Sequence, residues 1–320
     1  MGVVLYDSLT PLSFVMGVLW FNIFVIVGLA MRKLLFPGKH STVPLVLLLA
    51  LSVLRIVLPF ELPGSIAIVS ENIYPTIVNI MRFELISFNT IGFTVHVFSI
   101  LIFLWVTVAT VLIIRYAIRI KEGIKKVYDL ADLPRDEYAE SILADMIGPN
   151  NVNIFRSMLS RYAFVSYIRP YIVLPTVDFT DDELRVLLRH EWKHYRNMDC
   201  IATGILDIIA KVFWWNPLAY VLKQNVSFMI ELKCDYYAVR NLDDHMHYLA
   251  ALKRMQQAPY QEPMFIAATS PFINDKSEVT DRLKTLIQRS KKSYSDRISS
   301  SICFSIVIFF DVCTVLYDTY

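Results

Sequence analysis

The stretch that decides the fold is His190-Glu191-Trp192-Lys193-His194, which matches the pattern H-E-x-x-H. Residues four apart on a helix share one face, so both imidazoles can bind the same metal ion. A glutamate directly after the first histidine lies where it can take a proton from a water molecule. The motif therefore predicts one catalytic Zn²⁺ ion, with His190 and His194 as ligands and Glu191 as the catalytic residue.

The residues upstream predict how this helix begins. Thr180 followed by Glu183 fits a capping box, so the helix should start after Thr180 and continue to His194. Its apolar stripe consists of Leu184, Leu187 and Leu188. Before it, residues 162–174 are rich in β-branched and aromatic types and are interrupted by Arg169-Pro170. This pattern predicts two short strands joined by a turn.

A catalytic zinc site needs a third protein ligand and an open position. Glu231 and Asp235 are four apart in a second predicted helix, residues 228–238. Glu231 fits as the third ligand, and Asp235 fits as the carboxylate that accepts an imidazole N–H. The alternatives for the third ligand are Cys234, His245 and His247. Three candidates could stabilise a developing oxyanion: Tyr195, Tyr236 and Tyr237.

The composition around this motif is that of a membrane protein. Apolar residues make up 55% of the 320 residues and charged residues 19%, compared with about 25% charged in soluble domains. The net charge is only +2 and no basic tract is present, which argues against direct nucleic-acid binding. Four apolar stretches are predicted to span the bilayer as helices: 12–31, 43–60, 91–114 and 298–316.

Lysine and arginine residues predict the orientation of these spans. They cluster between the first two spans, after the third and before the fourth, whereas the loop over 61–90 is acidic. The positive-inside rule then places both termini outside the plasma membrane and the region 122–297 in the cytoplasm. The apolar segment 200–222 is expected to be an interfacial helix, because a crossing there would separate His190 and His194 from Glu231. The predicted domains are a three-helix bundle (1–121), a peptidase domain (122–297) and a fourth transmembrane helix (298–320).

Four segments carry a resemblance to a known family. They are RPYIVLP (169–175), LLRHEWKHYRNMD (187–199), FWWNP (213–217) and ELKCDYYA (231–238). The chain resembles the integral-membrane zinc peptidases of the BlaR/MecR antirepressor type, the β-lactam sensor-transducers. The resemblance implies a mainly α membrane protein with four transmembrane helices. A cytoplasmic gluzincin-type α+β domain, a small sheet with the H-E-x-x-H helix, is inserted between the third and fourth.

The resemblance also implies residue roles. Zinc would be bound by His190, His194 and Glu231, with Glu191 as general base and Asp235 in support. Asp199 matches an aspartate of the family and is expected to be structural. Antibiotic receptors of this type carry a penicillin-binding domain after the fourth span, and this sequence stops at Tyr320, about where that domain would begin. The sensor domain is therefore expected to be missing.

The function implied is that of a zinc metalloendopeptidase in transmembrane signalling. Its substrate would be a cytoplasmic regulatory protein such as a transcriptional repressor, the chain itself, or both. The signal would enter through the 61–90 loop, the helical bundle or a separate sensor partner, and the family precedent allows a homodimer. A strand over 162–167 or 171–174 could pair with an extended substrate. Two alternatives stay open: a housekeeping gluzincin of the HtpX or prenyl-protein endopeptidase type, and a non-catalytic zinc-bound transducer.

Overall fold

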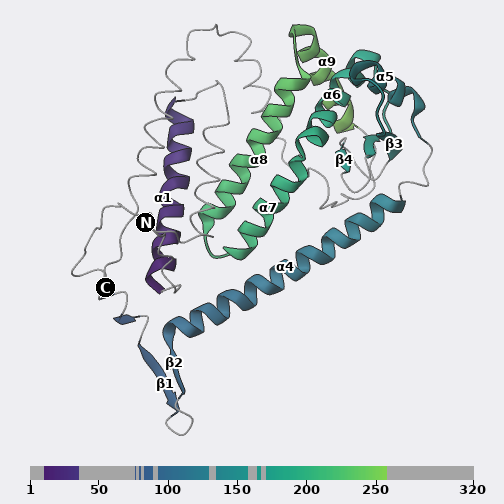
Figure 1. The fold of residues 1–320 in the computed structure, drawn as a ribbon. Coiled ribbons are helices and arrows are strands. Elements are labelled where there is room, and N and C mark those ends of the chain that lie inside the picture. The colour runs from purple at the N-terminus through teal and green to yellow at the C-terminus, as the bar shows by residue number, and fades with distance from the viewer. Residues whose placement is uncertain are drawn as a thin grey trace, which may run out of the picture. The chain divides into compact units, whose positions relative to one another are not determined.

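The computed structural model describes residues 11–35, 76, 79–80, 83–88, 93–129, 135–157, 164–166 and 171–257 (Figure 1). Its packing divides the chain into two compact units. One consists of Met1–Val108 together with Lys292–Tyr320, and the other is Ala109–Lys291. The H-E-x-x-H motif lies in the second unit.

Two apolar helices correspond to the first and third predicted spans. Helix α1 (Pro11–Leu35) contains the apolar stretch Gly17–Ala30. Helix α4 (Val97–Asp129) contains Val97–Gly123, the one helix within the described residues that is long and apolar enough to cross a membrane. The other two predicted spans lie outside the described residues: 43–60 and 298–316.

The third predicted span begins later than its hydropathy suggested. Residues Phe93–His96 form strand β2, which pairs antiparallel with β1 (Glu84–Phe88), and helix α4 starts at Val97. The β-branched residues of this stretch favour a pleated backbone. The predicted start of the span at residue 91 is therefore wrong, and His96 ends a strand instead of lying within a helix.

The second unit contains a small mixed sheet. The two predicted strands form β4 (Phe164–Ser166) and β5 (Tyr171–Pro175), which pair antiparallel. A third strand that was not predicted, β3 (Asn153–Ser157), pairs parallel with β5. It follows helix α5 (Glu137–Ile147). Strand β5 is thus central, and all five of its residues are buried.

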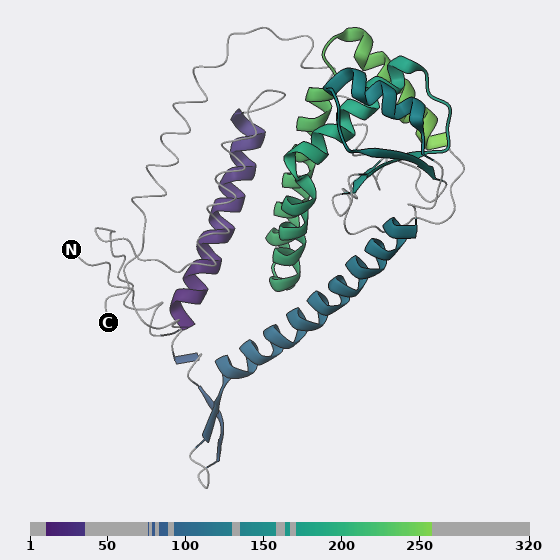
Figure 2. The ribbon, with the colours of Figure 1, turned by 45° about the vertical axis from the view of Figure 1, so that its right-hand side comes forward.

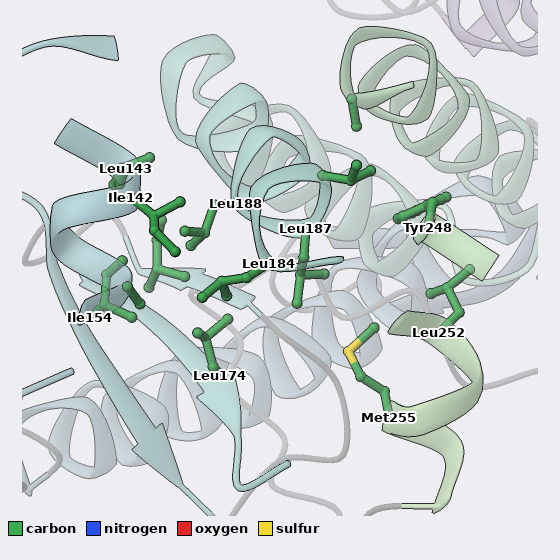
Figure 3. Close-up of a cluster of buried hydrophobic side chains, with 14 of the residues drawn as sticks. Ile142, Leu143, Ile154, Leu174, Leu184, Leu187, Leu188, Tyr248, Leu252 and Met255 are labelled. Carbon is green, nitrogen blue, oxygen red and sulfur yellow. The ribbon is translucent and has the colours of Figure 1, made fainter. Parts of the chain in front are cut away.

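Helix α6 (Asp181–Asn197) carries the metal motif and packs against this sheet. The predicted capping box is confirmed, since the Thr180 hydroxyl accepts from the Glu183 N–H and the Glu183 carboxylate accepts from the Thr180 N–H. In Figure 2 helices α5 and α6 lie over the same side of the sheet. Figure 3 shows the leucines of α6 among side chains from α5, the sheet and α9 (Leu242–Gln257). This core fixes the rotation of α6 and leaves its other face for the histidines.

The prediction of one helix over 200–222 is wrong. The segment contains α7 (Asp199–Val212), a turn over residues 213–216, and the first turns of α8 (Pro217–Ala238) (Figure 1). Pro217 begins α8, and the Asn216 side chain accepts a hydrogen bond from the Leu218 N–H, which is a typical helix start. The chain therefore returns along α8, so the start of α7 and the end of α8 lie at the same end of the hairpin.

Candidate metal centre

Three buried side chains from two helices meet at one point. His190 and His194 lie on α6, and their Nε2 atoms are 3.1 Å apart. In the Glu231 carboxylate of α8, Oε2 lies 3.7 Å from Nε2 of His190 and Oε1 lies 3.5 Å from Nε2 of His194. Each of the three residues is at most 4% exposed. The H-E-x-x-H motif thus meets the glutamate that the sequence selected as its third ligand, and the group is compact enough to hold a metal ion.

The three donor atoms fit a zinc ion in spacing and in kind. Bonds of about 2.0–2.2 Å at tetrahedral angles separate the ligand atoms by about 3.3–3.5 Å. The two Nε2 atoms are 3.1 Å apart, and the shortest distances from each of them to a Glu231 oxygen are 3.7 Å (Oε2 to His190) and 3.5 Å (Oε1 to His194), all close to that value. Two imidazoles and one carboxylate are a donor set typical of catalytic zinc sites. The residues present therefore suit Zn²⁺ without a rearrangement of either helix.

Two further side chains lie near Nδ1 of His190, the ring nitrogen that does not face His194 and Glu231. Its Nδ1 lies 3.1 Å from Oδ1 of Asp235, which is fully buried on α8. The hydroxyl of Tyr248 on α9 donates to the same carboxylate oxygen at 2.6 Å and lies 3.4 Å from Nδ1 of His190. A carboxylate at this position fixes the imidazole tautomer so that Nε2 faces the metal. Sequence reasoning missed Tyr248, because nothing in the local pattern of α9 distinguishes it from an ordinary core tyrosine.

His194 also has a carboxylate at Nδ1, the ring nitrogen that does not face Glu231. Its Nδ1 lies 2.9 Å from Oδ2 of Asp199, the first residue of α7. The Cys234 thiol donates to the same oxygen at 3.4 Å. Met198, with a φ of 54°, makes the left-handed turn that ends α6 and returns Asp199 towards His194. Asp199, expected to be structural, therefore contacts one of the two histidines of the motif directly.

Cys234 lies on the opposite side of His194 from Glu231. Its Sγ atom is 3.5 Å from Nδ1 of His194, so the three residues His194, Asp199 and Cys234 form a second compact group. Burial raises the pKa of the Cys234 thiol to about 12, which favours the protonated form. Because metals bind the thiolate, Glu231 is the better partner for the histidine pair.

The buried carboxylates control the charge of His194. Burial by itself would lower the pKa of His194, but the charge of Glu231 and the hydrogen bond with Asp199 outweigh that effect. The pKa of His194 is therefore raised well above its ordinary value when no metal is bound. A zinc ion that binds at neutral pH must consequently displace a proton from this site.

The remaining predicted site residues have different surroundings. Glu191 is buried on α6 directly after His190. Two of the tyrosines considered for an oxyanion, Tyr195 and Tyr236, pack against the hydrophobic core, and Tyr237 lies under the Lys193 amine, 4.8 Å from its ring centroid. His245 and His247 lie on α9, and Nε2 of His247 is 3.8 Å from Asp182 in the first turn of α6.

Comparisons with known proteins agree with this chemistry. Residues 13–286 match a family described as BlaR1 peptidase M56. Regulatory protein BlaR1 of Bacillus licheniformis is 27% identical over 145 residues, which is 44% of this chain and 24% of that protein. The methicillin resistance mecR1 protein of Staphylococcus aureus is 30% identical over 83 residues, covering 25% of this chain and 14% of that protein. The matching segments thus span a quarter or less of the length of these relatives.

Proposed function

The chain belongs to the BlaR1-type M56 peptidase family, and we propose that it is a membrane-embedded zinc endopeptidase that takes part in transmembrane signalling. The observation that carries the proposal is the convergence of His190, His194 and Glu231 within 3.7 Å, with Glu191 beside the first of them. Members of this family are zinc-dependent, and the donor set of this chain suits that ion.

The residues of the metal centre can provide the groups that hydrolysis of a peptide bond requires. His190, His194 and Glu231 would hold the zinc ion, which would supply a Lewis acid for a peptide carbonyl and lower the pKa of a water molecule towards neutrality. Glu191 accepts that proton as general base and returns it to the amine that leaves when the peptide bond breaks. Asp235 and Asp199 accept the Nδ1 protons of the two imidazoles, so that each Nε2 faces the metal position. The candidates for stabilising the oxyanion are Tyr195, Tyr236 and Tyr237.

A substrate in extended form would pair with the sheet beside α6. Strand β5 is bonded on one side to β3 and on the other to β4, so it offers no free edge. The outer edge of β3 is also occupied, because the Ile154 carbonyl accepts from the Asp136 N–H and the Ile154 N–H donates to Glu140. Of the two predicted strands, β4 is therefore the one proposed to receive a substrate strand.

The proposed topology places this chemistry in the cytoplasm. Four spans with both termini outside the plasma membrane would leave the peptidase region, 122–297, on the inner side. Its substrate would be a cytoplasmic regulatory protein such as a transcriptional repressor, or the chain itself. The signal would enter through the 61–90 loop, the bundle or a separate sensor partner, and the family precedent allows a homodimer.

Replacing Glu191 tests the function without removing the metal. The full chain and its Glu191→Gln variant are expressed in a bacterial membrane, and new protein N-termini are identified by mass spectrometry in membrane and cytosol. Wild type should generate cleavage products whose rate of formation falls about 10²–10⁴-fold in the variant. Both proteins should retain one zinc ion per chain, and Asp182→Asn, which changes an exposed carboxylate in the first turn of the same helix, should behave as wild type.

Other outcomes distinguish the alternatives. Zinc binding with identical N-termini in wild type and Glu191→Gln would contradict a peptidase and favour a zinc-bound transducer. Products from many unrelated membrane proteins, rather than from one regulator or from the chain itself, would favour a housekeeping peptidase. Loss of zinc from Glu191→Gln would make that variant uninformative about proton transfer and would contradict the assignment of Glu191 outside the ligand set.

A further inference from the structure

The surface of α7 and of the turn that leads into α8 has an unusual composition. Between residues 201 and 220, every side chain that is exposed is apolar or aromatic. These residues are Ile201, Ala202, Ile205, Ile208, Trp215, Pro217 and Tyr220. The three isoleucines follow helical spacing and form one stripe along α7, with exposed fractions of 55%, 51% and 44%. Such a continuous patch is unfavourable in water and marks a contact surface.

The charges of this segment are paired with one another. Asp207 accepts from the Lys211 amine at 3.1 Å and from the Lys223 amine of α8 at 2.6 Å. All three side chains are no more than 25% exposed. The segment therefore places no exposed charge among its apolar residues. Charge pairing of this kind is expected where a surface faces a medium of low polarity.

The same ion cluster contacts the membrane-spanning helix. The Lys211 amine lies over the ring of Tyr116 on α4, 4.0 Å from its centroid. A Cβ atom added to Gly204 of α7 would lie 3.8 Å from the Tyr116 hydroxyl, so the two helices approach closely. Tyr116 lies in the last third of the apolar stretch Val97–Gly123, between the exposed residues Arg115 and Arg119. Arginines at the end of a span mark the membrane–water boundary, so the hairpin contacts α4 at that level.

We propose that the isoleucine stripe of α7, together with Trp215 and Tyr220, contacts the acyl chains of the leaflet nearest the peptidase unit. Fourteen residues of α7 extend roughly 21 Å, less than the ~30 Å of hydrocarbon in a bilayer, so the hairpin enters one leaflet and returns. The hairpin is thus a lipid-facing element that does not cross the membrane.

This lipid contact would anchor the helices that build the metal centre. Asp199 begins α7, and Glu231 and Asp235 lie in the second half of α8. The metal centre is therefore about 20 Å along the hairpin from its turn. A substrate bond cleaved there would have to lie close to the membrane surface. The proposal concerns lipid contact and does not depend on the chain being a peptidase.

Photolabelling of the wild-type chain tests the contact directly. The full chain is reconstituted in vesicles of phosphatidylethanolamine and phosphatidylglycerol that contain a phospholipid with a diazirine in its acyl chain. After irradiation, adducts are mapped by peptide mass spectrometry. They should occur on the α7 stripe and around Trp215 and Tyr220, as well as on α4. Met246 of α9, which is 64% exposed, serves as the control and should carry none.

Two results would overturn the proposal. Adducts on α4 with none between residues 201 and 220 would show that water or protein covers the stripe. Equal labelling of the stripe and Met246 would show that the stripe contacts acyl chains no more than an exposed residue of α9 does. A double variant, Ile205→Asn with Ile208→Asn, should lose at least half of the hairpin adducts while keeping those on α4. Unchanged hairpin labelling in that variant would also contradict the proposed contact.

Discussion

The two ends of the α7–α8 hairpin differ in the burial and in the partners of their charged side chains. At the metal end, Asp199, Glu231 and Asp235 are at most 6% exposed, and each faces an imidazole. At the turn end, the exposed surface is apolar, and Asp207 is paired with lysines that remain partly exposed. Full burial of a carboxylate costs several kcal/mol of desolvation unless a partner compensates it. The metal end therefore carries a buried donor set suited to a cation, whereas the turn end has no exposed charge on its surface.

A matched pair of variants gives the largest expected difference between the two ends. Asp235→Asn removes the charge behind His190 and should weaken zinc binding about 10–100-fold. Asp207→Asn changes the same chemical group at the turn end and should leave zinc affinity unchanged. Both affinities can be measured on the purified full chain by competition with a chromophoric chelator. An equal loss in both variants would contradict the division of roles between the two ends.

The pH dependence of zinc binding tests the charge state of His194 at the metal end. Because the pKa of His194 is raised when no metal is bound, zinc must displace its proton. The apparent affinity should rise about tenfold per pH unit and level off once the pH passes the raised pKa. Calorimetry in buffers of different ionisation enthalpy would detect the released proton. A pH-independent affinity between pH 6 and 8, roughly the range that surrounds an ordinary imidazole pKa, would contradict this charge state.

The same shift affects the stability of the metal-free protein with the opposite sign. A raised folded-state pKa stabilises the fold below the pKa of the unfolded chain. That contribution is lost as the pH rises through the folded-state pKa of His194. The metal-free chain should therefore become less stable with increasing pH, whereas the zinc-loaded chain should not.

Tyr248→Phe should weaken zinc binding less than Asp235→Asn does. The variant keeps the ring, which packs in the core, and removes the hydroxyl that donates to Asp235. Zinc affinity should fall about threefold to tenfold, less than for the loss of the carboxylate itself. Tyr138→Phe is a matched control, since Tyr138 donates to Asp181 at an exposed site. If both variants bound zinc as wild type does, Tyr248 would be a packing residue without a role in positioning Asp235.

Local sequence patterns predicted the parts of the fold that local interactions stabilise. The capping box at Thr180 and Glu183 is a contact between residues three apart, and it starts α6 as expected. The β-branched pattern of 162–174 likewise predicted β4 and β5. Strand β3 was missed, because its place beside β5 depends on pairing between segments distant in the sequence. Asn216-Pro217 is a sequence pattern typical of a turn before a helix. The prediction of one helix missed the turn over 213–216 because the whole segment is apolar.

By itself, the sequence determined the chemistry of the centre: two histidines at helical spacing, an adjacent glutamate, and a second helix with an acidic pair. Those choices rest on periodicity, which acts within one helix. The tertiary structure decided which side of each imidazole meets which carboxylate, because α6, α7, α8 and α9 all contribute to the site. Tyr248 and Cys234 reach the site only because separate helices pack together. The course of α8 back along α7 also depends on tertiary packing, which brings Glu231 to the histidines.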